Sequence, residues 1–115
     1  MENEITINGQ TYVLKPSPDD LPYCIIRTYS AGVHAGFLVR REGKEVELRN
    51  ARRIFKWRGA ATLSQAARDG FLYPKECLFP CEVAMIILTE AIEIIPCSEK
   101  AKNCIRNEVP EWEAK

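Results

Sequence analysis

Short runs of β-branched and aromatic residues, separated by turn signals, most limit how this chain folds. Asn8-Gly9 lies between two such runs, Glu4–Ile7 and Thr11–Leu14. This dipeptide predicts a hairpin, because both central positions of a type I′ turn need a positive φ. Two prolines then interrupt residues 15–20, which we expect to form a loop.

Further short runs with the extended pattern follow along the chain, and turn residues separate them. They cover residues 23–29, 37–40, 46–48 and 54–57. Residues 30–36, which are small apart from Val33 and His34, are expected to form an irregular connection with His34 exposed on it. This succession of short strands predicts an antiparallel meander.

The C-terminal half is predicted to add two short helices. Thr62 suits an N-cap and Gly70 suits the position after a helix, and apolar residues lie between them at helical spacing. Ser98 is expected to cap a second helix that continues to about Asn107, and Pro110 prevents its extension.

Residues 82–95 fit two patterns. Their isoleucines favour strands, whereas their spacing also fits one face of a helix, and we prefer strands. With 46% hydrophobic and 28% charged residues, the composition is that of an ordinary globular protein. We therefore predict a single α+β domain over residues 1–115, an antiparallel meander sheet with two short helices in the C-terminal half.

No secretory or membrane segment is predicted. The longest apolar run, Val83–Leu88, is far shorter than a membrane span needs, and Met1–Glu4 is acidic and lacks a signal-peptide core. The five cysteines are odd in number and include no CxxC pair, so we expect reduced thiols and no metal site. The expected location is the bacterial cytoplasm.

Charge is unevenly distributed along a chain that is neutral by count. Residues 24–68 carry ten basic and three acidic side chains, and nine of the sixteen basic residues in the whole chain are arginines. A zero net charge argues against binding to long nucleic acids. A local group of arginines instead suggests a small anionic partner, because the planar guanidinium suits phosphate and carboxylate groups.

The residues do not predict an enzyme or a cofactor. His34 is the only histidine, and the chain has no GxSxG, HExxH, Walker A or Rossmann glycine pattern. Pairs of carboxylates exist, but a chain with 28% charged residues is expected to contain them.

Several residues instead have the types and spacing that favour binding of a nucleotide-like ligand. Arg27 and Tyr29 share a face of the expected strand, and Ser30 and Gly32 follow where a phosphate can approach backbone N–H groups. Lys56–Arg58 places an aromatic ring between two cations. The competing interpretation is a solvated basic face that protects strand edges.

Two more residues are predicted to be structural from their surroundings. Phe79 lies between Leu78 and Pro80 in an expected loop, where a phenylalanine more often joins a small core. Arg106 on the last helix is expected to pair with Glu99 or Glu108.

Three segments together resemble a family of small proteins of tailed phages and prophages. They are IIRTYSAGVHAG at 25–36, ARRIFKWRGAATL at 51–63 and LTEAIEIIPC at 88–97. This family in turn is similar to the first type of Thoeris anti-defence proteins. The resemblance spans roughly residues 23–107.

The resemblance implies a sponge for an immune signal. Such proteins bind glycocyclic ADP-ribose, and some bind cyclic oligonucleotides, without cleaving them. By resemblance, Arg27 and Arg106 grip the diphosphate, Phe79 stacks on a base, and Thr89 stands where the family has an asparagine. Threonine lacks the amide that reads an adenine edge.

Beyond the resemblance, we predict a second surface for cyclic oligonucleotides at Arg52, Arg53 and Arg58. A sponge needs at least nanomolar affinity, about 12 kcal/mol. A few phosphate contacts and one stacked base do not supply that without an enclosed pocket. We therefore expect a homodimer or higher homo-oligomer with the ligand near its interface. The alternative function is a non-catalytic structural or protein-interaction module of a phage.

Overall fold

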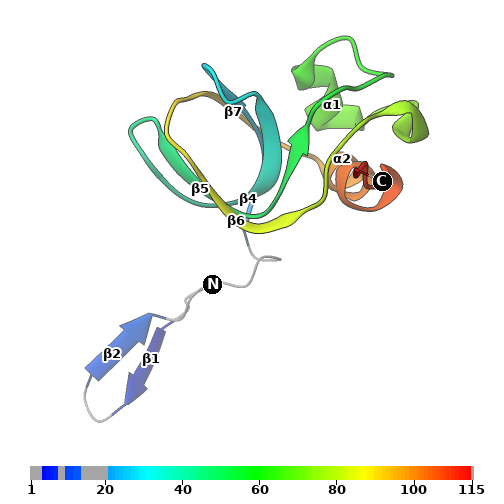
Figure 1. Cartoon of the computed structure of the whole chain (residues 1–115). Coiled ribbons are helices and arrows are strands. Elements are labelled where there is room, and N and C mark those ends of the chain that lie inside the picture. The colour runs from blue at the N-terminus through cyan, green and yellow to red at the C-terminus, as the bar shows by residue number, and fades with distance from the viewer. Residues whose placement is uncertain (1–3, 8–9, 14–20, 115) are drawn as a thin grey trace.

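Five antiparallel strands form the central sheet of the computed structural model, which describes residues 4–7, 10–13 and 21–114. Along the sheet the strand order is β6-β5-β4-β3-β7 (Figure 1). The strands are β3 (Tyr23–Thr28), β4 (Val33–Glu42), β5 (Glu45–Ile54), β6 (Val83–Leu88) and β7 (Ala91–Pro96). The predicted α+β fold with an antiparallel sheet is confirmed.

The N-terminal hairpin is also confirmed. β1 (Glu4–Ile7) pairs antiparallel with β2 (Gln10–Val13), and Ile7 lies opposite Gln10. The Asn8-Gly9 turn and the loop expected at 15–20 lie outside the described residues.

The sheet curls because β4 and β5 are long and bent. Each has ten residues, and their register shifts twice, between Ala35 and Phe37 and between Leu38 and Arg40. Gly36 lies at the first shift, where a Cβ atom would be 3.1 Å from backbone atoms of β5, so a larger residue would need β5 to move slightly away.

The curled sheet forms an open barrel. β6 and β7 are its two edges, although only two residues separate them along the chain. The tip of the β4–β5 hairpin reaches β7, where the Ala91 N–H donates to the Lys44 carbonyl at 2.9 Å. This contact partly closes the barrel.

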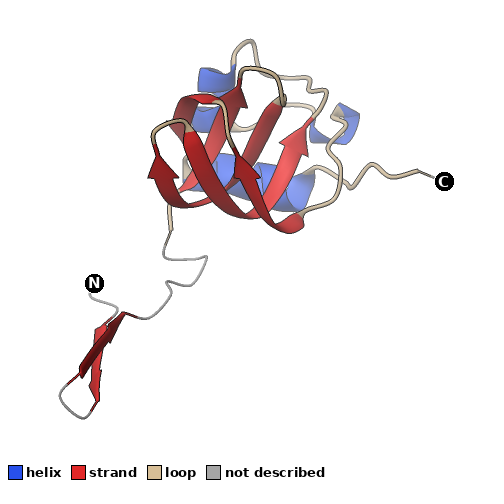
Figure 2. Ribbon diagram, turned by 60° about the vertical axis from the view of Figure 1, so that its left-hand side comes forward, coloured by secondary structure: helices blue, strands red, loops and turns tan. Residues whose placement is uncertain are grey.

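β3 is buried on both faces and separates two hydrophobic cores. Inside the curl, Cys24 and Ile26 contact residues of β5 and β6 such as Leu48. On the other face, Tyr23 and Ile25 lie in a core that includes residues from the helical segments. Figure 2 shows the helices gathered behind the sheet.

Both predicted helices are present with their predicted caps. α1 (Leu63–Asp69) begins at Thr62, whose hydroxyl accepts from the Gln65 N–H at 3.1 Å, and Gly70 follows it with φ 76°. α2 (Glu99–Asn103) begins at Ser98, whose hydroxyl accepts from the Ala101 N–H at 3.1 Å.

Helical structure outside these two helices has other forms. α2 continues directly into a π-helical turn, η3 (Cys104–Glu108), and a 3-10 turn, η2 (Pro74–Glu76), lies between α1 and β6. None of the helices in the described ranges is long and apolar enough to cross a membrane.

Two expectations about the strands need correction, and one is confirmed. Residues 82–95 do form strands, β6 and β7. However, β4 begins at Val33, so His34 is a strand residue with only 2% of its surface exposed. The strand predicted over residues 54–57 is also wrong, because β5 ends at Ile54. Lys56 makes an isolated bridge to Leu78.

Most of the cysteines serve as small core residues. Cys24, Cys77 and Cys104 are buried, Cys97 is half-buried and Cys81 is exposed, and all are free thiols. Burial raises the pKa of Cys24 to about 11 and that of Cys97 to about 12. These two thiols are therefore protonated at neutral pH and are poor nucleophiles.

Candidate ligand-binding site

Three neighbouring cavities surround the end of β5 and share lining residues. We call the first, of about 350 Å³, the Arg53 cavity; its lining includes Ser30, Gly32, Arg53, Phe55 and Trp57. A cavity of about 430 Å³ shares Phe55 and Trp57 with it, and one of about 270 Å³ shares Arg53. Together they make one hollowed surface at the end of the barrel that carries the β3–β4 connection.

The Arg53 side chain links β5 to residues between β3 and β4 through a hydrogen bond. Its Nη2 atom donates to the Ala31 carbonyl at 2.8 Å. The connection is held by Thr28, whose hydroxyl donates to the Gly32 carbonyl at 2.7 Å and accepts from the Ala31 N–H at 2.9 Å. A guanidinium is therefore fixed beside a small, exposed stretch of backbone.

Aromatic rings and further cations extend the site. Phe55 is 49% exposed and stacks on Trp112, with ring centroids 5.3 Å apart. The Lys56 ammonium lies 5.8 Å from the centroid of the Phe55 ring. Arg58 lies over the ring of Tyr73 and forms an ion pair with Glu76 at 2.8 Å. Flat rings beside cations suit a planar ligand with negative charge.

The structure brings three of the predicted residues to one rim. The Tyr29 N–H donates to the Glu90 carbonyl at 3.0 Å, and the Ser30 hydroxyl donates to the Glu90 carboxylate at 3.2 Å. Thr89 is exposed in the same β6–β7 turn. Because Glu90 adds negative charge to this rim, the phosphate groups of a ligand fit better beside Arg53.

Phe79 does not have the exposed position that its implied stacking role requires. Its ring is completely buried, edge-on to Phe71 with centroids 5.3 Å apart, and the Arg52 guanidinium lies 5.4 Å from its centroid. The structural role expected from its sequence neighbours is correct, and the base-stacking role implied by the resemblance is not.

Arg52 also faces the core and not a ligand surface. It is 3% exposed and donates to five backbone carbonyls at 2.6–3.2 Å, those of Phe79, Pro80, Ile105, Val109 and Pro110. These bonds hold the C-terminal segment against the sheet. The prediction that Arg52 belongs to a second ligand surface is therefore wrong, whereas Arg53 and Arg58 do line cavities.

Arg27 and Arg106 lie at opposite ends of β3. Arg106 lies over the ring of Phe37, which pairs with Tyr23 at the start of the strand, and it forms an ion pair with Glu82 at 3.0 Å. Arg27 comes four residues after Tyr23, about 13 Å further along the strand, and pairs with Glu93 at 3.3 Å. The expected partners of Arg106, Glu99 and Glu108, are replaced by Glu82.

His34 lies beneath the β3–β4 connection and stays neutral. Its Nε2–H donates to the Ala31 carbonyl at 3.0 Å, and burial lowers its pKa from the ordinary value. Within residues 21–114 no group of three or more His, Cys, Asp or Glu side chains is placed to hold a metal ion.

Two residues of the site were not singled out from the sequence. Phe55 follows Arg53 at a spacing of two, so strand alternation could have placed the two side chains on one face. Trp112 stacks on Phe55 across a long separation in the chain, and no local pattern predicts that contact.

Residues 21–105 match the family described as Domain of unknown function (DUF6948). The chain belongs to this family. No curated protein and no solved structure matches it. The DUF6948 match includes every lining residue of the Arg53 cavity, but it ends just before Arg106 and well before Trp112.

Proposed function

We propose that this DUF6948 protein binds and sequesters a small cyclic nucleotide signal, of the glycocyclic ADP-ribose type or a cyclic oligonucleotide, without cleaving it. The observation that carries the proposal is the Arg53 cavity, where a fixed guanidinium lies beside exposed backbone and two aromatic residues. The resemblance to anti-defence proteins supplies the ligand class, and the geometry supports a binding role.

The phosphate groups would bind at Arg53. A guanidinium has five N–H donors, and the described residues engage only one of those of Arg53, in the bond to Ala31. The remaining donors suit a bidentate contact with a phosphate. Lys56 and Arg58 lie in the adjoining cavity and add positive charge.

The base and ribose would bind against the aromatic residues. Phe55 and Trp57 line both of the larger cavities at this end, so a ring on one side and a phosphate on the other can be held at once. These two larger cavities each have a volume within the range usual for small-molecule sites.

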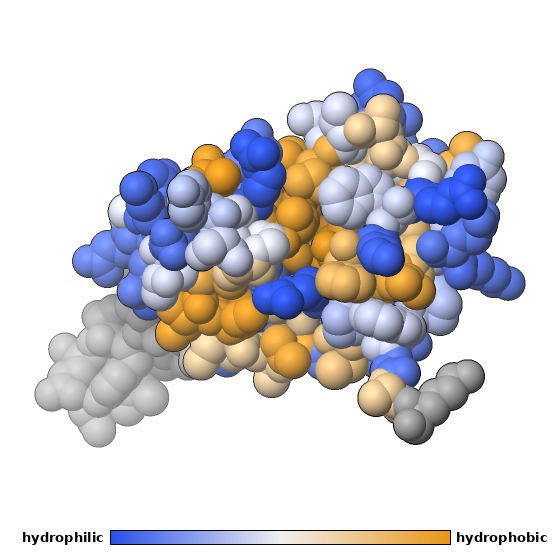
Figure 3. Space-filling view, turned by 45° about the horizontal axis from the view of Figure 1, so that its top comes forward, coloured by the Kyte–Doolittle hydropathy of each residue, from blue (hydrophilic) through white to orange (hydrophobic). Residues whose placement is uncertain are grey.

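We also propose that a second copy of the chain completes the enclosure. The outer side of β6 exposes three large apolar side chains, Val83, Met85 and Ile87. Val83 also lines the smallest of the three cavities together with Arg53. A homodimer or higher homo-oligomer formed through this surface would cover apolar area beside the ligand and shield the ligand from water. Figure 3 shows hydrophobic surface between hydrophilic side chains on the face that it draws.

Calorimetric titration with a panel of cyclic ADP-ribose isomers and cyclic di- and trinucleotides tests the proposal. We expect one ligand to bind tightly, Arg53→Ala to weaken it by at least about thirtyfold, and Arg68→Ala to leave it unchanged. Arg68 is a suitable control because it is exposed on α1 and pairs with Asp69. The ligand recovered after denaturation should be chemically intact.

Three results would count against the proposal. A hydrolysed ligand would indicate an enzyme. Loss of binding in Arg106→Ala together with normal binding in Arg53→Ala would move the site to the helix-covered side. Absence of binding across the whole panel would favour the alternative, a protein-interaction module that uses the exposed apolar side of β6.

A further inference from the structure

The outer edge of β7 presents backbone groups away from the sheet. In the strand order β7 pairs with β3, and the Cys97 N–H donates to the Tyr23 carbonyl at 2.7 Å. Because N–H and C=O groups alternate in direction along a strand, those of Glu93 and Ile95 also face β3. The N–H and C=O groups of Ile94 therefore point outward.

This outer edge is short because it is limited at both ends. At one end the Ala91 N–H already donates to Lys44 in the β4–β5 hairpin, and Ile92 is an extra residue in a bulge. At the other end Pro96 has no N–H to offer. A strand added here would pair over a segment of about three or four residues centred on Ile94.

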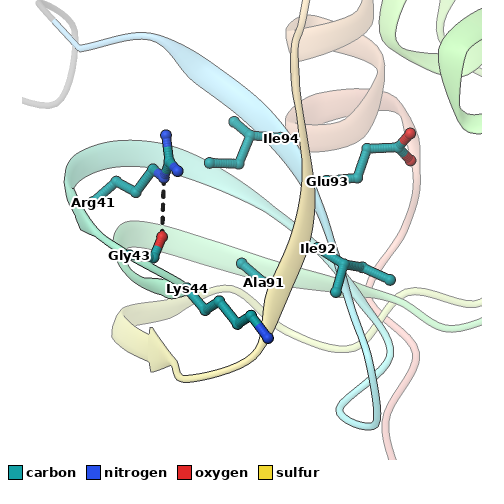
Figure 4. Close-up of a pocket in the computed structure, with 7 residues that line it drawn as sticks. All are labelled: Arg41, Gly43, Lys44, Ala91, Ile92, Glu93 and Ile94. Atoms are coloured by element: carbon teal, nitrogen blue, oxygen red, sulfur yellow. Dashed lines mark hydrogen bonds between the residues drawn. The ribbon is translucent and has the colours of Figure 1, made fainter.

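A cavity of about 460 Å³ lies along this edge, and its open side is basic and apolar. It is lined by Arg41, Gly43 and Lys44 from the hairpin and by residues 91–94. Figure 4 shows Arg41 and Lys44 on the same side of the β7 ribbon as Ile94. The Arg41 Nε atom donates to the Gly43 carbonyl at 3.0 Å, which orients its guanidinium.

The one carboxylate that lines the cavity does not neutralise these cations. Figure 4 shows the Glu93 carboxylate on the other side of the β7 ribbon, and its ion pair, at 3.3 Å, is with Arg27. Neither Arg41 nor Lys44 forms an ion pair among the described side chains.

We propose that this cleft binds a short, extended peptide segment of another protein that carries acidic side chains. The segment would add to the edge of β7 through the backbone of Ile94, as in β-augmentation. Because side chains alternate between the two faces of a strand, its carboxylates would meet Arg41 and Lys44 on the side of β7 that carries Ile94, and its apolar residues would lie on the other side, with Ile92. A second copy of this chain fits less well through the same edge, because it would bring two more cations to the interface.

This site is separate from the Arg53 cavity, with which it shares no lining residue. The proposal therefore does not rest on the proposed nucleotide-binding function. Variants at one site should leave binding at the other unchanged, so failure of one proposal can be distinguished from failure of the other.

Fluorescence anisotropy with a labelled Glu-Val-Glu-Val-Glu peptide tests the proposal. We expect this peptide to bind at least about tenfold more tightly than Lys-Val-Lys-Val-Lys, and the double variant Arg41→Glu, Lys44→Glu to weaken it by at least about tenfold. Lys100→Glu on α2 is the control and should have no effect. The melting temperature of each variant checks that it is folded.

Backbone pairing distinguishes augmentation from simple charge attraction. Amide hydrogen exchange at Ile94 should slow by at least about tenfold when the acidic peptide is bound. A version of the peptide that is N-methylated at alternate residues should bind at least about tenfold more weakly. Equal binding of the methylated peptide, equal binding of the lysine peptide, or unchanged binding to the double variant would each overturn the proposal.

Discussion

Arg52 and Arg53 are adjacent in β5 but belong to two different regions of the molecule. Arg52 faces the helix-covered side, where five carbonyls surround its guanidinium. Arg53 faces the hollowed end of the barrel and bonds to one carbonyl, that of Ala31. Arginine thus holds segments of the fold together in one region and is a candidate ligand contact in the other.

The difference between the two regions shows which cations can serve a ligand. A buried guanidinium is tolerated only when its N–H groups have partners, and those partners leave none for a ligand. At the hollowed end, backbone and aromatic groups surround Arg53 without enclosing it. The predicted site residues divide accordingly, with Ser30, Arg53 and Arg58 at this end and Arg52 on the helix-covered side.

The largest expected effect is on the stability of the helix-covered side. Arg52→Met should lower the free energy of unfolding by about 3–5 kcal/mol, because five carbonyls lose a charged donor at once. Arg53→Met should lower it by less than about 1 kcal/mol, because that side chain is exposed. Urea denaturation followed by circular dichroism measures both. Equal losses for the two variants would remove the distinction between the regions.

Phenylalanines provide a second contrast between the regions. Phe79→Leu should cost about 1.5 kcal/mol of stability and leave ligand affinity within about twofold, because the ring is buried in the core. Phe55→Leu should change the free energy of unfolding by about 0.5 kcal/mol or less but lower the affinity for the ligand by about fivefold or more. Calorimetric titration and urea denaturation of both variants give the two readouts. Loss of affinity in folded Phe79→Leu would restore its stacking role.

The stability of the wild-type protein should depend on pH through His34. Burial lowers its pKa in the folded protein, so the unfolded chain takes up a proton first as the pH falls through about 6.5. The free energy of unfolding should therefore fall as the pH drops from about 7.5 to about 5.5. His34→Gln, which can still donate to Ala31, should show a smaller fall over the same range. An identical pH dependence in both proteins would show that His34 is not responsible.

The smallest expected effect concerns Tyr23 on the helix-covered side. Its hydroxyl is buried and has no hydrogen-bond partner among the described residues, while its ring packs edge-on against Phe37. Tyr23→Phe should leave the free energy of unfolding unchanged or raise it by about 0.5 kcal/mol, because removal of an unpaired polar group costs nothing. A loss of about 1 kcal/mol or more in thermal or urea denaturation would indicate a bond that holds the hydroxyl.

Local chemistry made the secondary structure largely predictable. The β1–β2 hairpin followed from Asn8-Gly9, and α1 followed from Thr62 and Gly70, because turns and caps depend on a few neighbouring residues. The strand at His34 could not be predicted in this way. It depends on pairing with β5, where His34 lies opposite Arg53, which is a contact between distant parts of the chain.

The site was predictable only where it depends on local sequence. Strand alternation places Arg52 and Arg53 on opposite faces, but it does not say which face is covered. The carbonyls that surround Arg52 come from segments 27 to 58 residues away. The combination of Ser30, Gly32 and Trp57 was predicted from residue types alone, whereas its meeting with Arg53 in one cavity follows from the β4–β5 register, in which Val33 lies opposite Ile54.

The carbonyl cluster around Arg52 has a consequence for how the C-terminal segment is attached. Three of its five acceptors, those of Ile105, Val109 and Pro110, lie beyond α2. Because a single guanidinium in the middle of the sheet binds all three, loss of that one side chain would release this segment at three points at once.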